Sequence, residues 1–330
     1  MNKFEIYFHP ETNLTGKPLQ GIEAAEAISG FEIKRQTIFQ EFGSGLPPAR
    51  KDLNYFRKVH NETYLDGIIK LSREEPAELN ISLECEGLQH FLPGYEYSLG
   101  GVCAAIDRMR EGTMERAYCY ALPSHHAYPD RGHGYCLLNT MAAGVHYARE
   151  QSFSRALIID WDHHHGDGTQ TIFERDSSVH QISIHSAIDL YMGMVNAQNL
   201  GTTVHAEKTG HRNIPILDIH YDEAFFYDCG LEGKFYRHDS FFDAYMDAIN
   251  NLSFGPDIIF VFDGHDAHRD DQGKDVAMWD YSDFAKLTRS VLHLSRQHNC
   301  PVIFMSGGGY NRKTAIQCTR QNIELLRNYR

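Results

Sequence analysis

The sequence predicts an open, doubly wound α/β fold with a mostly parallel sheet flanked by helices. Short continuous apolar runs recur along the chain, as is typical of strands buried on both faces of a parallel sheet. They alternate with stretches of helical periodicity, the pattern of strand–helix–strand units. No internal repeat, low-complexity segment or Pro/Gly/Ser-rich linker divides the 330 residues. We therefore predict one domain over residues 1–330.

Six strands are expected: FEIYF (4–8), AYCYAL (117–122), RALIID (155–160), VHQISI (179–184), DIIFVF (257–262) and PVIFM (301–305). The expected helices are 17–29, 61–73, 98–111, 139–151, 240–252, 282–297 and 313–327. Ser98 is suited to cap the third of these helices. Residues 187–235 are too irregular to assign and are expected to form functional loops.

Composition is that of a globular protein in a reducing compartment, and we predict a cytoplasmic location. Hydrophobic residues make up 42% and charged residues 23% of the chain. The seven cysteines are odd in number and form no CxxC pair, which argues against both a disulfide framework and a cysteine zinc site. The start of the chain lacks the apolar run of a signal peptide, and no stretch approaches the roughly 18 apolar residues of a membrane span.

The net charge of −13 argues against a nucleic-acid partner, since such proteins normally carry a basic face. An acidic surface suits cationic substrates such as lysine tails or polyamines. It equally well keeps a protein soluble, so charge alone does not choose between these two roles.

The densest chemical signal follows the strand 155–160, in the run DWDHHHGDG (160–168). In an extended chain Asp162 and His164 point the same way, so a carboxylate and an imidazole share one side of the strand end. Zinc accepts such mixed ligands and uses three protein ligands in catalytic sites. Gly166 and Gly168 allow the chain to turn away directly afterwards. The sequence therefore predicts half of a zinc site here.

A third ligand should come from another strand end, because ligand sites in such sheets lie at the carboxyl ends of the strands. Strand 257–262 runs into a loop with four aspartates. Spacing alone leaves the choice among them open: Asp263, Asp266, Asp270 and Asp271.

Two further strand ends carry candidate catalytic groups. His125 and His126 follow strand 117–122, and histidine is the usual general acid–base. A histidine pair alone is more often structural, but nearby carboxylates favour catalysis because they set tautomer and pKa. After strand 301–305 come three glycines and Tyr310, whose hydroxyl could polarise a carbonyl or stabilise an oxyanion. A glycine run alone is typical of a tight turn.

Together these segments resemble the histone deacetylase and acetylpolyamine amidohydrolase superfamily, in a class II-like form. The matching motifs are LPSHHA with GHGYCLLN, IIDWDHHHGDGTQ, HDAHRDDQG and SGGGYN, in the family's order over positions 123 to 311. FRKVHNETYL (56–65) extends the likeness. The resemblance implies an arginase/deacetylase-like fold.

The resemblance implies one zinc ion held by Asp162, His164 and Asp271, with Asp266 as a buried supporting carboxylate. His163 stands where the family has an apolar residue, and Gln272 replaces a family proline. The catalytic set would be His125, His126 and Tyr310, with Asp160 holding His125 and Asp167 holding His126.

The family also carries structural monovalent cations, K⁺ in this reading. One would use Asp160, the backbone oxygens of Asp162 and His164, and Ser183 and Ile184. A second would lie near Phe173, Asp176 and Val179.

A narrow substrate tunnel normally leads to the metal. Gly134 and Tyr135 match one wall, and Gly308 is a further expected substrate contact. The loop of the other wall is altered to LYMGMVNAQNLG (190–201), where Tyr191 or Met192 would replace the family's aromatic residue. Met278 stands where some polyamine-specific members have an acidic residue, and a neutral residue there favours acyl-lysine.

The predicted function is zinc-dependent removal of an acetyl or other acyl group from a lysine side chain or similar amine. The alternatives are an acetylpolyamine amidohydrolase and an inactive acyl-lysine-binding scaffold, although the chain retains every catalytic group. A two-metal ureohydrolase of the arginase type is disfavoured because Gly166 stands where its D-x-H-x-D motif needs a ligand. The predicted partners are the substrate and other copies of the chain in an oligomer, without nucleic acid or membrane.

Overall fold

The computed structural model describes residues 3–12, 33–34, 36–38, 40–42, 48–79, 81, 85–187, 210–228 and 233–329. In this part of the chain one seven-stranded sheet runs in the order β1-β2-β7-β6-β3-β4-β5, and all paired strands are parallel. The strands are β1 (Phe4–Tyr7), β2 (Arg116–Cys119), β3 (Ala156–Asp160), β4 (Val179–Ser186), β5 (Arg212–Ile216), β6 (Ile258–Asp263) and β7 (Val302–Ser306). The predicted fold class is confirmed.

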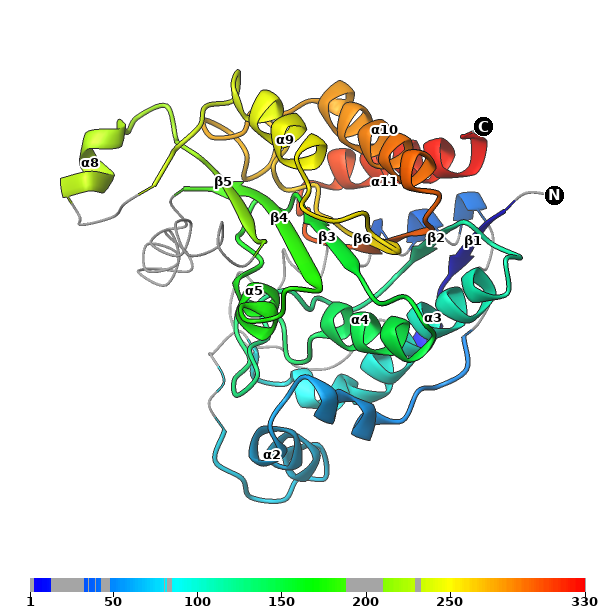
Figure 1. Ribbon diagram of the computed structural model, residues 1–330. Helices are drawn as coiled ribbons and strands as arrows, with labels where there is room; N and C mark the ends of the chain where they lie inside the picture. Colours follow the sequence, from blue (N-terminus) through cyan, green and yellow to red (C-terminus); the bar gives the residue numbers. More distant parts are fainter. Residues whose placement is uncertain are drawn as a thin grey trace.

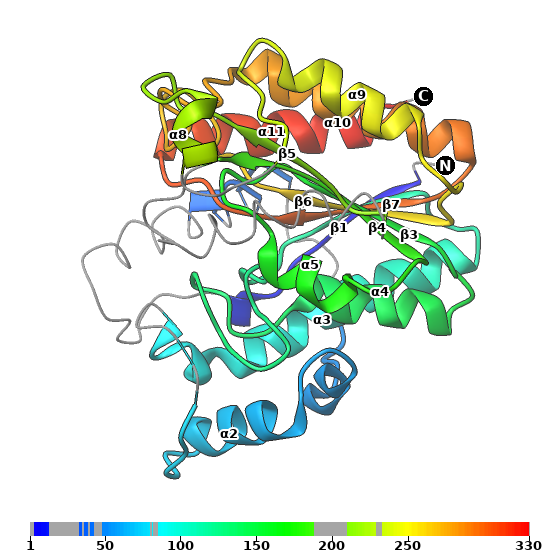
Figure 2. The same cartoon turned by 60° about the vertical axis from the view of Figure 1, so that its left-hand side comes forward.

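Helices cover both faces of the sheet (Figures 1 and 2). On one face, α9 (Phe241–Asn250), α10 (Tyr281–His298) and α11 (Arg312–Asn328) bury one apolar cluster with the strands. On the other face, α3 (Leu92–Arg110) and α4 (Thr140–Glu150) bury a second cluster, with α2 outside them. The remaining helices are α2 (Glu62–Ser72), α5 (Asp167–Phe173), α8 (Glu223–Asp228), and the short 3₁₀ turns η1 (Pro10–Thr12), η2 (Leu53–Lys58) and η4 (Leu88–Phe91).

The six expected strands are all present, and β5 is the strand that the sequence pattern missed. Its sequence, RNIPI, has two polar residues and a proline in five positions, so no apolar run marks it. Pro215 is tolerated because β5 pairs only with β4 and lies at the edge of the sheet. This segment is identified as a strand only by its pairing with β4 in the folded protein.

Helix α3 begins at Leu92, before the predicted start at Ser98. Pro93 stands in its first turn, where a missing N–H costs nothing. Ser98 is therefore inside the helix rather than its cap, and its hydroxyl donates to the Gly94 carbonyl oxygen. The predicted helix 17–29 lies outside the described residues.

The sheet brings distant polar segments together at one edge. Register pairs Asp160 of β3 with Phe262 of β6, and Asp263 of β6 with Ser306 of β7. Because all strands run the same way, the segments that follow β2, β3, β6 and β7 emerge at the same carboxyl edge.

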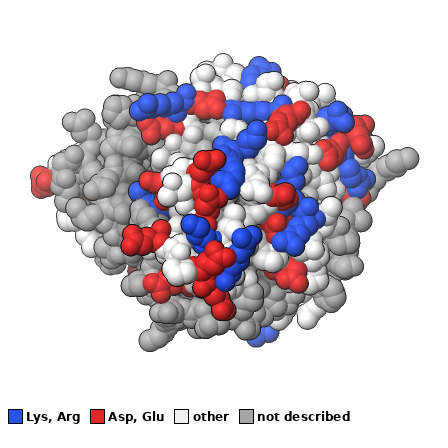
Figure 3. All heavy atoms as spheres, turned by 90° about the horizontal axis from the view of Figure 1, so that it is seen from below, with Lys and Arg blue, Asp and Glu red and all other residues white. Residues whose placement is uncertain are grey.

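Acidic and basic side chains are interspersed on the face seen from below in Figure 3. Ion pairs such as Arg57–Asp66 and Lys58–Glu150 occur among the described residues. This face therefore shows no wide single-sign field of the kind that binds nucleic acid. In the described part of the chain, no helix is both long and apolar enough to cross a membrane.

His60 links the first helical segments to the loop that precedes α4. Its Nδ1 lies 2.8 Å from the Tyr128 carbonyl oxygen, and its Nε2 accepts from the Asn139 backbone N–H at 2.9 Å. Asn139 in turn caps α4 through Ala142. The ring must be neutral to accept this hydrogen bond, and burial lowers the pKa of His60 to about 4.

We predict that His60 makes the free energy of unfolding decrease as the pH is lowered. Between pH 6.5 and 4 the unfolded chain binds a proton at this residue that the folded chain rejects, so stability falls as pH falls through that window. Replacing His60 with Gln should reduce the slope by about 1.4 kcal/mol per pH unit, the value for one proton. Urea denaturation of metal-free protein measures it. His293→Gln, at an exposed position, is the control and should leave the slope unchanged.

Candidate active site

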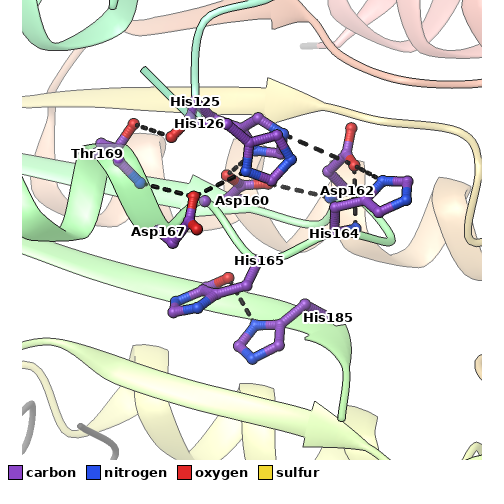
Figure 4. Close-up of polar contacts among 12 residues, drawn as sticks. His125, His126, Asp160, Asp162, His164, His165, Asp167, Thr169 and His185 are labelled. Atoms are coloured by element: carbon purple, nitrogen blue, oxygen red, sulfur yellow. Dashed lines mark hydrogen bonds and ion pairs between the residues drawn. The ribbon is translucent and has the colours of Figure 1, made fainter. Parts of the chain in front are cut away.

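Three buried side chains from two strand ends converge on one point. Asp162 and His164 follow β3, and Asp266 follows β6; one ligand atom from each lies within 4.8 Å of the other two. His164 Nδ1 lies 3.2 Å from Asp162 Oδ1 and 3.2 Å from Asp266 Oδ2. Figure 4 shows the His164 ring turned toward Asp162. We call these three residues the ligand cluster.

The structure places Asp266, and not the predicted third ligand Asp271, beside Asp162 and His164, and Asp271 as a zinc ligand stays a prediction. Asp271 is described but does not belong to the ligand cluster, and Asp266 takes that place. Asp271 serves the backbone instead: its Oδ2 accepts from the N–H groups of Tyr310 and Asn311 at 2.8 and 2.7 Å. Asp266, expected as a supporting carboxylate, reaches the cluster because it is nearer to the end of β6.

The ligand cluster fits a divalent metal. Burial raises the pKa of Asp266, and the neighbouring Asp162 raises it further, because two carboxylates cannot share a dry site without a counter-charge. Burial acts in the same direction on Asp162, but His125 and His164 hold its pKa well below the usual value. Asp266 Oδ2 accepts no hydrogen bond of ordinary geometry from the described residues. One nitrogen and two carboxylates are a donor set that zinc accepts.

Gly308 leaves the room that the cluster needs. Its N–H donates to Asp162 Oδ2 at 2.7 Å. A Cβ at this position would lie 2.8 Å from that oxygen and closer still to Asp266 Oδ2. A residue with a side chain would therefore enter the space between the two carboxylates.

The tandem histidines lie beside the ligand cluster. Figure 4 shows their rings together, with Asp167 on one side and Asp162 on the other. The ring centroids of His125 and His126 are 4.0 Å apart, and His125 Nε2 lies 3.9 Å from Asp162 Oδ1. His125 also stacks on Phe262 of β6 at 4.2 Å, which fixes the plane of its ring.

Each histidine has its own carboxylate, placed as predicted. His125 Nδ1 lies 3.0 Å from Asp160 Oδ2, and His126 Nδ1 lies 2.8 Å from Asp167 Oδ1. This contact leaves His125 Nε2 on the cluster side, and it leaves Nε2 of His126 as the ring nitrogen that Asp167 does not hold. Burial, and the neighbouring His125, lower the pKa of His126, so its ring is neutral at pH 7.

The pKa values of the two carboxylates shift in opposite directions. Burial alone would raise the pKa of Asp167, but His126 and the Tyr128 hydroxyl hold it well below the usual value. That hydroxyl donates to Asp167 Oδ2 at 2.7 Å, a contact that no sequence motif indicated. Burial raises the pKa of Asp160, and the nearby Asp162 raises it further.

Tyr310 lies at the edge of the cluster, after the glycine turn. Its ring meets the His164 ring edge-on at 6.5 Å between centroids. Burial raises the pKa of its hydroxyl well above the usual 10, so the group remains a proton donor in a hydrogen bond. Asp271 positions its backbone, as described above.

The predicted monovalent-cation residues fall into two groups. In the first, Asp160 and Ser183 are register partners on β3 and β4, and Ile184 follows Ser183. In the second, the Phe173 carbonyl oxygen accepts from His211 Nε2 at 2.9 Å, and the Asp176 carboxylate contacts Arg149 and Ser178. The Phe173 carbonyl and the Asp176 carboxylate thus accept hydrogen bonds from protein groups. A monovalent cation at this second position stays a prediction.

The predicted tunnel residues are only partly placed. Gly134 and Tyr135 have φ of 52° and 60° in a turn closed by hydrogen bonds between His133 and Cys136, beside the tandem histidines. Tyr135 is a non-glycine residue in the left-handed region, a conformation found at functional sites. Met278 also has positive φ, 51°. Tyr191 and Met192 lie outside the described residues.

Comparison with known proteins agrees with this geometry. Residues 25–326 match the family model described as the histone deacetylase domain. A probable deacetylase of Archaeoglobus fulgidus is 30% identical over 227 residues, which cover 68% of this chain and 58% of that protein. The match thus spans little more than half of that relative.

Two solved structures share the fold. The HDA15 HD domain superposes with a TM-score of 0.76 at 19% identity, over 99% of this chain and 90% of that one. An acetylpolyamine aminohydrolase from Burkholderia pseudomallei superposes with a TM-score of 0.70 at 20% identity, over 98% of both chains.

A pair of variants tests which aspartate binds the metal. Asp266→Asn should weaken Zn²⁺ binding by more than about 100-fold, since changing even an outer-shell partner commonly costs 10- to 100-fold. Asp271→Asn should leave the affinity close to that of the unaltered chain, because its carboxylate serves backbone N–H groups. Competition with a chromophoric chelator measures both. A large loss in Asp271→Asn alone would restore the original assignment.

Proposed function

The chain belongs to the histone deacetylase domain family, and from this premise we propose that it is a zinc-dependent amidohydrolase that removes an acetyl or other acyl group from an amine. The observation that carries the proposal is the ligand cluster with the tandem histidines directly beside it. Family membership supports hydrolysis of acetylated amines, and the buried donors support the metal. We further propose that residues 1–330 act as one catalytic domain.

Zinc would be held by Asp162, His164 and Asp266. A zinc ion bound in such a site acts as a Lewis acid toward a carbonyl oxygen and lowers the pKa of a bound water to about 7. The chain would enclose the ion among buried side chains, since all three ligand residues are buried. K⁺ beside it, held by Asp160, Ser183 and Ile184, is part of the proposal.

The tandem histidines move the protons. His126 takes the proton of the attacking water at Nε2, because its Nδ1 is held by Asp167 and its ring is neutral. The ionised Asp167 stabilises the imidazolium that forms. The pair then returns a proton to the leaving amine, and the close approach of the two rings allows either one to serve it.

Tyr310 donates a hydrogen bond to the oxygen that becomes negative as the water adds to the amide carbonyl. Two features support this role. The ring lies next to His164, and its hydroxyl stays protonated.

We propose acyl-lysine as the substrate, in a protein or peptide, and a cytoplasmic location. The neutral Met278 supports acyl-lysine over an acetylated polyamine. One structure with the same fold, from Burkholderia pseudomallei, is named for acetylpolyamine. An acetylated polyamine is therefore the substrate against which acyl-lysine should be compared. Rates on an acetyl-lysine peptide, a longer acyl-lysine peptide and an acetylated polyamine, measured side by side, would decide among the three.

Tyr310→Phe should lower kcat on an acetyl-lysine peptide by about 10²–10³, the usual effect of losing one oxyanion donor. Zinc content, measured on the same sample, should not change, because the hydroxyl is not in the ligand cluster. Tyr329→Phe, near the end of α11 and away from the site, is the control. Near-normal turnover by Tyr310→Phe would refute the assigned role. No turnover by the zinc-loaded, unaltered chain would favour an inactive acyl-lysine-binding scaffold.

A further inference from the structure

A buried lysine lies behind the ligand cluster, and the mechanism above does not use it. Lys34 is 0% exposed. Its Nζ donates to the Gly307 carbonyl oxygen at 2.7 Å and to the Gly308 carbonyl oxygen. A Cβ at Gly309 would lie 3.1 Å from the same Nζ, so the ammonium is packed against the whole glycine turn.

One peptide group joins this lysine to the ligand cluster. The carbonyl of Gly307 and the N–H of Gly308 belong to the same peptide unit. Lys34 donates to its oxygen, and its N–H donates to Asp162 Oδ2 at 2.7 Å. A cation at the oxygen end polarises the peptide and strengthens the hydrogen bond at the other end. Lys34 therefore acts on Asp162 through a single rigid amide.

Asp263 is a buried acid that contacts the same glycine turn as this lysine, through the Gly307 N–H. Burial lowers the pKa of Lys34, and Asp263 opposes that shift more than Asp266 or Asp162 does. Its Oδ1 accepts from Trp161 Nε1 at 3.1 Å and from Asn322 Nδ2 at 2.8 Å. Its Oδ2 lies 3.2 Å from His265 Nε2. Asp263 is 0% exposed, so water does not screen its charge.

We infer that Lys34 and Asp263 are positioning residues that set the charge at the ligand cluster from behind, with the peptide group between Gly307 and Gly308 as the connection to Asp162. The positive charge of Lys34 makes the electrostatic potential at the metal-binding carboxylates less negative. The negative charge of Asp263 partly cancels this effect. This inference rests on the proposed metal site.

Removing the charge of Lys34 and removing the charge of Asp263 should change zinc affinity in opposite directions. Lys34→Met removes a buried positive charge, so Zn²⁺ should bind about tenfold more tightly; Asp263→Asn removes a buried negative charge and should weaken binding about tenfold. The double variant should return toward the unaltered chain. Chelator competition on metal-free protein at a fixed pH measures all four affinities, independently of turnover.

Two further variants separate charge from packing. Lys34→Gln keeps a hydrogen-bond donor without the charge and should also bind Zn²⁺ more tightly. Thr288→Val removes the hydroxyl that donates to Asn322 Oδ1, on the far side of the network. It should lower the melting temperature without changing zinc affinity.

The outcomes are distinguishable. Weaker binding in both Lys34→Met and Asp263→Asn, or no change in either, would overturn the inference and leave the two residues a structural role. Failure of the unaltered chain to bind Zn²⁺ would instead refute the proposed function. If Lys34→Met does not fold, Lys34→Gln and Asp263→Asn still give the two signs.

Discussion

The site depends on the close approach of two buried carboxylates, Asp162 and Asp266. Both sit at the carboxyl edge of one parallel sheet, in loops that follow adjacent strands, so the fold itself forces them together. Isolated charges in such a place are costly to bury. A divalent cation offsets that cost and is attracted by it. The same electrostatic repulsion that would destabilise an empty site would favour the binding of a metal ion.

The surrounding residues make this arrangement tolerable. Backbone N–H groups reach the carboxylates directly: Gly308 donates to Asp162, and His163 donates to Asp266 Oδ1 at 2.9 Å. Glycine is required in the turn because a side chain at position 308 would fill the space between the two acids. Behind that turn the only buried lysine among the described residues supplies a fixed positive charge.

The histidine pair shows how environment can separate two similar groups. Both rings contact a carboxylate through Nδ1, but His126 and the Tyr128 hydroxyl lower the pKa of Asp167, whereas burial and Asp162 raise the pKa of Asp160. The two rings are therefore not equivalent, although they are adjacent in the sequence. A pair of titratable groups in unlike surroundings is suited to acid and base roles in one reaction.

The family resemblance predicted the carboxylate partners of the tandem histidines. The sequence by itself determined the fold class and six of the strands, and it predicted the tandem histidines and two residues of the ligand cluster. These follow from local patterns: continuous apolar runs, and polar residues placed directly after them. Tertiary structure decided the rest. It placed Asp266 rather than Asp271 beside Asp162 and His164, because four aspartates in one loop differ only in where the folded loop carries them. It revealed β5, which pairing stabilises despite a proline, and it placed Lys34 against a glycine turn far away in the sequence. Local sequence patterns indicate which polar residues follow a strand. Only the packing of the folded chain determines which of these side chains come into contact.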